Sequence, residues 1–229
     1  MIVLLWILAI LVVLIFFMLF VTFKRMRVPM APEMTPGDLG ESRKPEYFAQ
    51  QQESFLAAGL MPGGDFVWHE GLSTMGMRCF LRNDGDVYAW AVEKWLAGSN
   101  GVECNVTALT QFKDGALLDT TTKAKGGYVS PPWFLRETAV LDTELLLRRH
   151  QERIQEQTAQ GKEINKVDTG TLLETITHHE RRISQYQIDI GRMRRVGDKL
   201  AYGTGRALLM AFIAFGQLLS QPFRRRGAR

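Results

Sequence analysis

The chain has 229 residues, a formal net charge of +4 and a pI of about 9.2. After an apolar N-terminal segment, about 200 residues remain, which is enough for one folded domain plus helical extensions. The positive excess is concentrated in short clusters, and no signature of a nucleic-acid-binding fold accompanies it, which argues against nucleic acid as a partner.

Residues 1–23 form an apolar segment without a charged side chain. At about 1.5 Å per residue, a helix of this length reaches across a hydrocarbon core of roughly 30 Å. The segment lacks the basic start and the small-residue cleavage site of a signal peptide, so we interpret it as an uncleaved transmembrane anchor. Because Lys24, Arg25 and Arg27 follow it, the positive-inside rule predicts a single-pass protein with its N-terminus outside and the bulk of the chain in the cytoplasm.

Residues 24–45 are rich in proline, glycine and charge, and they are expected to form a linker. Residues 46–140 then predict a small α+β cytoplasmic domain. A helix over Tyr47–Leu60 is followed by short apolar runs that alternate with turns. Asp84-Gly85 and Asp114-Gly115 each lie between two such runs and predict β-hairpins. We expect an antiparallel sheet of about five strands, with one face buried beneath the helix and the other face polar.

Cys79 and Cys104 both fall within the predicted strands. In a cytoplasmic domain such cysteines are expected to be reduced, buried and inert.

Residues 141–200 predict an antiparallel helical hairpin or coiled coil. Asp142 is a predicted N-cap, Gly161 a predicted end, and Thr171 with Glu174 forms a capping box for a second helix. Apolar positions recur at heptad spacing in both helices. The predicted helix-pairing seam consists of Leu147, His150, Ile154, Leu172, Ile176, His179, Ile183, Tyr186 and Ile190.

Folding these helices back on each other near residue 165 places His150 opposite His179. We interpret this pair as a polar layer that sets the register, because zinc needs three or four ligands and the seam offers no further ligand one turn away. No metal and no cofactor is therefore predicted. The same heptads are also compatible with pairing between two molecules or with a partner helix.

Residues 201–229 contain the apolar run Ala207–Leu219, which is shorter than a membrane span, and a basic tail. An interfacial helix keeps both basic flanks on the cytoplasmic side, so we predict a C-terminal membrane-associated helix. The basic side chains expected to contact lipid headgroups are Lys24, Arg25, Arg27, Arg206, Arg224, Arg225 and Arg226.

No nucleophile or acid–base constellation is recognisable, so the sequence predicts a protein that is not an enzyme. We expect a membrane-anchored accessory or scaffolding subunit of a membrane protein assembly, which docks through its transmembrane helix and helical hairpin. Its expected partners are membrane lipids and either membrane proteins or further copies of itself. The alternative is a lipid or apolar-ligand binding protein, in which tryptophans line a pocket of the sheet domain. These tryptophans are Trp68, Trp90, Trp95 and Trp133.

Overall fold

The computed structural model describes residues 2–31, 33–39, 42–70, 73–96, 101–122, 130–138, 142–212 and 215, without the side chains of residues 2–5, 7–9, 69, 70 and 96. This part of the chain is a mixed α+β protein in two units. The first unit combines Met1–Met30 with Ser184–Arg229, and the second unit is Ala31–Ile183.

The elements of the second unit follow one another along the chain. They are β2 (Thr35–Pro36), α2 (Pro45–Ala57), β3 (Leu60–Glu70), β4 (Ser73–Arg82), β5 (Tyr88–Leu96), β6 (Val102–Gln111), β7 (Leu117–Thr121), β8 (Phe134–Thr138), α3 (Thr143–Ala159) and α4 (Leu172–Asp189), the last of which continues into the first unit.

The strands of the second unit form one seven-stranded sheet in the order β2-β3-β4-β5-β6-β7-β8. All neighbours are antiparallel except β7 and β8, which run parallel. The two predicted hairpins are confirmed: Gly85 turns β4 into β5 and Gly115 turns β6 into β7, both with positive φ. The sheet is larger than the expected five strands because β2 and β8 extend its two edges.

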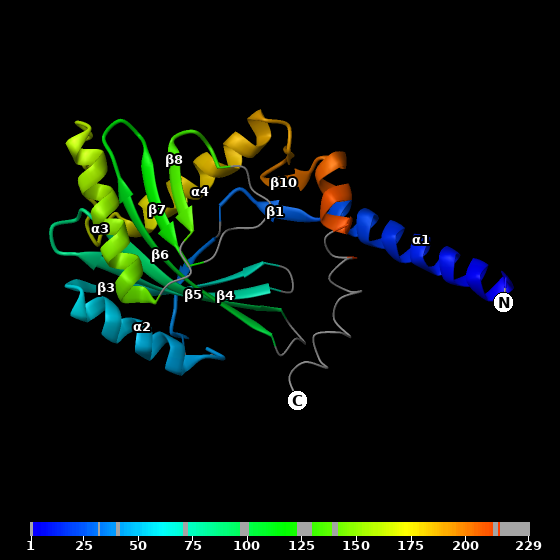
Figure 1. Ribbon diagram of the computed structural model, residues 1–229, viewed down its shortest axis with the longest axis horizontal. Helices are drawn as coiled ribbons and strands as arrows, with labels where there is room; N and C mark the ends of the chain where they lie inside the picture. The colour runs from blue at the N-terminus through cyan, green and yellow to red at the C-terminus, as the bar shows by residue number, and fades with distance from the viewer. Residues whose placement is uncertain are drawn as a thin grey trace. The chain divides into compact units, whose positions relative to one another are not determined.

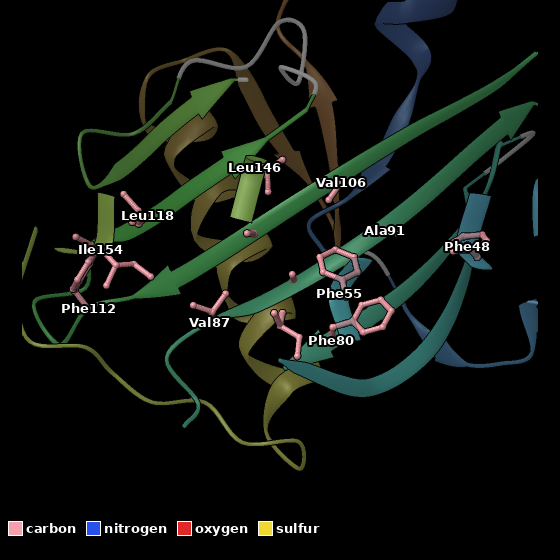
Figure 2. Close-up of a cluster of buried hydrophobic side chains, with 14 of the residues drawn as sticks. Phe48, Phe55, Phe80, Val87, Ala91, Val106, Phe112, Leu118, Leu146 and Ile154 are labelled. Atoms are coloured by element: carbon pink, nitrogen blue, oxygen red, sulfur yellow. The ribbon is translucent and has the colours of Figure 1, made fainter. Parts of the chain in front are cut away.

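Helices α2 and α3 cover one face of this sheet (Figure 1). The core beneath them joins Phe48 and Phe55 of α2 and Leu146 of α3 to inward-facing residues of the strands. Figure 2 shows how these side chains meet over β4, β5 and β6. The strand residues are small where the helices cross, such as Ala91 and Ala108, so the helices approach the sheet closely.

Helix α4 covers the opposite face. Leu172, Ile176 and Ile183 pack there on alternate residues of the same strands, including Cys79 and Leu109. The second unit therefore has three layers, with helices on both faces of the sheet (Figure 1). A sheet buried on both faces is the reason that β7 is buried at every position.

The predicted helical hairpin is wrong. Helices α3 and α4 form where the capping residues placed them, and Asp142 Oδ1 accepts a hydrogen bond of 2.8 Å from the backbone N–H of Leu145. However, they lie on opposite faces of the sheet and do not pair. The physical reason is that each apolar stripe can be covered by a sheet face as well as by another helix, and both sheet faces needed a cover.

The connection between α3 and α4 crosses the hairpin end of the sheet. The backbone N–H of Asn165 donates to the carbonyl of Gln111 at 2.8 Å, and the N–H of Val167 donates to the carbonyl of Gly85 at 3.0 Å. This segment thus runs past the tips of both hairpins, which carries the chain from one face to the other.

The predicted second helix is also too long. Helix α4 ends at Asp189 and Gly191 follows with a φ of 72°. The rest of the region that was expected to be helical, up to Leu200, forms a β-hairpin with its turn at Gly197. Glycines at these two places supply the left-handed conformations that end a helix and close a two-stranded turn.

The described residues of the first unit form one small sheet and two helices, besides the end of α4. Its elements are α1 (Ile2–Arg25), β1 (Arg27–Pro29), β9 (Met193–Val196), β10 (Lys199–Tyr202) and a helix over residues 204–212. The strands are antiparallel in the order β1-β10-β9. Aromatic contacts join α1 to the C-terminal segments, with the rings of Phe16 and Phe212 4.6 Å apart and those of Phe23 and Tyr202 6.4 Å apart.

The predicted transmembrane anchor is not supported. None of the helices in the described residues has both the length and the apolar character that membrane crossing demands. The single-pass topology, the outside N-terminus and the cytoplasmic placement that depended on this anchor are corrected with it.

The predicted membrane-associated helix at the C-terminus is corrected as well. The described helix covers residues 204–212, and Ala207 and Ala211 are completely buried. These two small residues lie on one helical face that packs within the first unit, next to the contact between Phe16 and Phe212. The rest of Ala207–Leu219, apart from Phe215, lies outside the described residues.

Candidate functional site

The predicted seam residues are divided between the two faces of the sheet. His150 and Ile154 are buried between α3 and the sheet, and Leu147 is partly buried beside them. The seam residues of α4 up to Ile183 are buried on the other face, whereas Tyr186 is half-buried and Ile190 is 39% exposed. The seam is therefore mostly core, and it brings no two of its polar members together.

His150 is a bridge within the core. Its Nε2 lies 3.0 Å from the hydroxyl of Thr110, and its Nδ1 lies 2.9 Å from the hydroxyl of Thr120. Arg153 Nη1 donates to Thr120 Oγ1 at 2.9 Å and to the backbone carbonyl of Asp119 at 2.7 Å. Burial, followed by the charge of Arg153, lowers the pKa of His150 to about 3, so the ring is neutral at physiological pH.

His179 has a different environment on the opposite face. Its ring is parallel to that of Tyr88 within 7°, with the ring centroids 6.3 Å apart. Among the described residues, neither the two ring nitrogens of His179 nor the hydroxyl of Tyr88 has a hydrogen-bond partner. Burial and the nearby charge of Arg182 lower the pKa of His179 to about 4.

The basic residues after α1 have a local structural role. The Nη1 of Arg27 donates to the backbone carbonyls of Lys24, Arg25 and Met26 at 3.3, 3.0 and 3.1 Å. Carbonyls at the end of a helix have no partner within it, so this guanidinium caps α1. Lys24 and Arg25 are exposed and Arg206 is half-buried, while Arg224, Arg225 and Arg226 lie outside the described residues. Contact of these side chains with lipid headgroups stays a prediction.

Helix α1 presents an apolar outer stripe. Trp6, Ile10, Val13 and Phe17 are 65%, 57%, 66% and 57% exposed. Their spacing of four, three and four residues places them along one face of the helix. Leu11, Leu14 and Met18, on another face, are 52%, 54% and 65% exposed, so α1 exposes apolar side chains on more than this stripe. Large apolar side chains in such a continuous stripe are uncommon on isolated proteins and mark interaction surfaces.

The four tryptophans that were expected to line a pocket are divided between the two faces of the sheet. Trp68, Trp90 and Trp133 lie on the sheet face that α4 covers, where they pack at the margin of the core. Trp95 lies on the other face and its ring is 5.5 Å from the guanidinium carbon of Arg43. They do not form one cluster, so this arrangement does not favour the apolar-ligand alternative.

A polar cavity of about 320 Å³ lies between α2, β6 and the N-terminus of α3. Its described lining consists of Tyr47, Gln50, Gln51, Ser54, Cys104, Asn105, Val106, Thr122, Asp142, Thr143 and Glu144. Two of these described residues carry a carboxylate, and none of them is lysine, arginine or histidine. The described part of the cavity wall thus consists mainly of hydrogen-bonding groups, two of them carboxylates.

Hydrogen bonds hold the walls of this polar cavity in place. Tyr47 Oη donates to the backbone carbonyl of Asn105 at 2.8 Å, which ties α2 to β6. The Oδ1 of Asn105 accepts from the hydroxyl of Thr122 at 2.8 Å. Thr143 Oγ1 donates to Gln51 Oε1, which joins α3 to α2. Since each wall comes from a different element, the cavity exists only in the folded chain.

Cys104 faces this polar cavity as a free thiol, and it is half-buried rather than buried as expected. Burial and the charge of Glu93 raise its pKa, so the thiol stays protonated at neutral pH. Cys79, in contrast, is fully buried and free. The expectation of a reduced, buried thiol is confirmed for Cys79 alone.

Glu93 is a buried carboxylate next to the polar cavity. It is 0% exposed and pairs across the sheet with Cys104, on the same face. Its Oε1 accepts from the backbone N–H of Arg43 at 3.2 Å, and its Oε2 has no hydrogen-bond partner in the part of the chain that the structure describes. Its charge reaches the two lining residues Tyr47 and Cys104, because it raises the pKa of both.

No pattern in the amino-acid sequence pointed to this cavity. Tyr47, Glu93, Cys104 and Glu144 are separated along the chain and share no motif spacing. Within the part of the chain that the structure describes, no three histidine, cysteine or acidic side chains are grouped closely enough to hold a metal ion.

No protein-family model matches the chain, and neither a curated protein nor a solved structure matches it.

Proposed function

We propose that this chain is a non-catalytic accessory or scaffolding subunit of a protein assembly, which binds a partner protein through the outer stripe of α1. The observation that carries the proposal is the exposure of Trp6, Ile10, Val13 and Phe17 along one helical face. An apolar stripe on a helix needs a cover, and the inner side of α1 already packs against Phe212 and Tyr202.

The spacing of the outer stripe supports a helical partner. Steps of four and three residues bring successive side chains into line, so they can insert between the residues of a facing helix. Aromatic anchors such as Trp6 and Phe17 supply much of the binding energy in interfaces of this kind. The second unit then serves as the folded body that the subunit contributes to the assembly.

Site-specific cross-linking tests this proposal. A photoreactive amino acid is placed at Val13 or Phe17 in the full chain, expressed in its native cells. The matched control carries it at Met61, an apolar side chain that is 53% exposed on the second unit. We expect one cross-linked partner of defined mass from positions 13 and 17 and none from position 61.

The double variant Val13→Asp/Phe17→Asp provides a second test of the same proposal. We expect it to lose the partner on co-purification while Met61→Asp keeps it, because a buried unpaired carboxylate opposes an apolar interface. The proposal fails if positions 13 and 17 give no product, or if the same products form from position 61. A product of twice the chain mass identifies the partner as a second copy.

A further inference from the structure

We propose that the partner of α1 is a different protein that presents two neighbouring helices, each with a carboxylate where it passes Lys24 or Arg25. This inference rests on the function proposed above and specifies the partner of the same helix. It depends on two apolar stripes of α1 and on the cation that follows each of them in line.

A second apolar stripe lies beside the outer stripe of α1. Leu11, Leu14 and Met18 form this second stripe, and all three are more than half exposed. Successive residues of an α-helix are about 100° apart around its axis, so the second stripe lies about 100° from the outer stripe. Val12 and Ile15, on the far side of the second stripe, are less exposed, at 38% and 39%. The exposed apolar surface is therefore concentrated on two adjacent faces.

A third side of α1 is covered within the first unit. There Phe16 contacts the ring of Phe212, and Phe23 contacts the ring of Tyr202. A single facing helix covers only a narrow seam, and it cannot lie on both exposed stripes at once. A partner that buries both stripes thus needs two helices, one for each face.

Each stripe leads to a cation at the end of α1. Lys24 lies seven residues after Phe17, and Arg25 lies seven residues after Met18. Seven residues are close to two helical turns, so each cation lies almost in line with its stripe. Both side chains are exposed. The Nζ of Lys24 is 5.7 Å from the ring centroid of Phe20, which keeps this charge on the α1 surface.

The acidic residues of the first unit do not neutralise these two cations. They are Asp189 and Asp198. Asp189 accepts a hydrogen bond of 2.8 Å from Gln185 Nε2, and none of the ion pairs among the described residues includes Lys24 or Arg25. A partner helix that lies along a stripe must pass its cation, and a carboxylate at that point supplies the complementary charge that selects a partner and sets its register.

A second copy of α1 does not meet this requirement. Residues 1–23 contain no charged side chain, so a facing α1 offers no carboxylate to Lys24 or Arg25 in either orientation. In a parallel pair the cations of the two copies would also lie close together, and like charges at the edge of an interface oppose association. The charges therefore favour a different protein with acidic residues.

Cross-linking from both stripes tests the requirement for two helices. A photoreactive amino acid at Val13 reports on the outer stripe, and one at Leu14 reports on the second stripe, each in the full chain expressed in its native cells. We expect both positions to join the same partner protein, at two segments that are separate along its chain, as mapped by mass spectrometry of the digested products. Val12, on a less exposed side of the same helix, is the control position and should give no partner product.

Charge reversal tests the requirement for carboxylates. We expect Lys24→Glu/Arg25→Glu to weaken co-purification of the cross-linked partner about tenfold or more. The control Arg194→Glu/Lys199→Glu makes the same change in net charge at exposed positions of the β9–β10 hairpin and should keep the partner. Replacing the acidic residues beside the two mapped partner segments by lysine should restore binding to the reversed chain.

The inference is overturned if Leu14 gives no product while Val13 does, or if both positions label one segment of the partner. It is also overturned if the reversed chain binds as well as the control, if the control loses the partner equally, or if the lysine exchange restores nothing. In all these cases products from Val13 and Phe17 leave the proposed function intact. The proposed function itself fails when Val13 and Phe17 give no product at all.

Discussion

His150 and Thr120 join α3 to the sheet through a buried contact of 2.9 Å between Nδ1 and the threonine hydroxyl. The other ring nitrogen contacts Thr110 at 3.0 Å, so the ring connects two strands separated by one hairpin. Replacing His150 by leucine leaves both hydroxyls buried with fewer partners. We expect a loss of about 1–3 kcal/mol in the free energy of unfolding, measured by urea denaturation.

The triple variant His150→Leu/Thr110→Val/Thr120→Val is the control for this interpretation. It removes the polar groups together with their partner, so part of the lost stability should return. If His150→Leu alone is as stable as the unmodified chain, the bridge has no role in stability.

Gly85 permits the crossing of the α3–α4 connection. Its φ is 75°, and a Cβ placed on it would lie 2.5 Å from the carbonyl oxygen of Val167. Gly161 also has a positive φ, of 87°, but a Cβ there meets nothing within 4 Å. Alanine at position 161 should therefore cost about 1 kcal/mol from backbone strain alone, whereas alanine at position 85 should cost clearly more.

Equilibrium unfolding of Gly85→Ala and Gly161→Ala, measured side by side, makes this comparison. Equal losses for the two variants would show that the close approach between Gly85 and Val167 is not a constraint in solution.

Stability should fall as the solution is acidified below pH 6.5. The pKa of His179 is about 4 in the folded chain, against 6.5 for an unperturbed histidine. Between these values the unfolded chain binds the proton and the folded chain does not, so the contribution is complete above pH 6.5 and is lost as pH falls toward 4. Each unit of pKa difference corresponds to about 1.4 kcal/mol.

The difference in the free energy of unfolding between the unmodified chain and His179→Leu isolates the contribution of His179. The carboxylates and His150 contribute equally to both chains and cancel. Denaturant midpoints measured from pH 7.5 to pH 4 should converge or cross as the pH falls. A constant difference over this range would contradict the assignment.

Asp119 and Arg136 form an ion pair beneath the α4 side of the sheet. Arg136 Nε donates to Asp119 Oδ2 at 2.6 Å, and the two side chains are 16% and 1% exposed, in that order. Removing one partner leaves the other charge buried, so Arg136→Met should destabilise the second unit by about 3–5 kcal/mol. Thermal unfolding of Arg136→Met, of Asp119→Asn and of the double variant measures the coupling energy between the two side chains.

The combined variant should be more stable than the sum of the two losses predicts, since neither charge is then left alone. Simple additivity would indicate that the pair is exposed to water in solution.

Local features of this chain could be predicted because short-range chemistry decides them. The Asp-Gly pairs at 84–85 and 114–115 produce hairpins, Asp142 caps α3, and Gly161 follows the end of that helix. Each of these features depends on a backbone conformation or a hydrogen bond within a few residues. The mixed α+β character follows from the same local patterns.

The pairing of α3 and α4 was predicted wrongly because a heptad stripe specifies only that a helix needs an apolar cover. The prediction that the second face of the sheet is polar was also wrong, and Thr107 and Thr121 on that face show why. Both are buried, with their hydroxyls 3.0 Å apart. Mutual hydrogen bonds let polar side chains occupy a buried face, and the amino-acid pattern does not reveal such pairing.

The apolar character of residues 1–23 was determined by the sequence, but how the chain uses that segment was not. The structure packs Phe16 against Phe212 and leaves Val13 and Phe17 exposed. It likewise assembles the polar cavity from Tyr47, Asn105 and Glu144, which are far apart along the chain. Local conformation is set by neighbouring residues, whereas contacts between distant segments depend on which faces remain to be covered after the sheet has formed, and only the tertiary structure decides that.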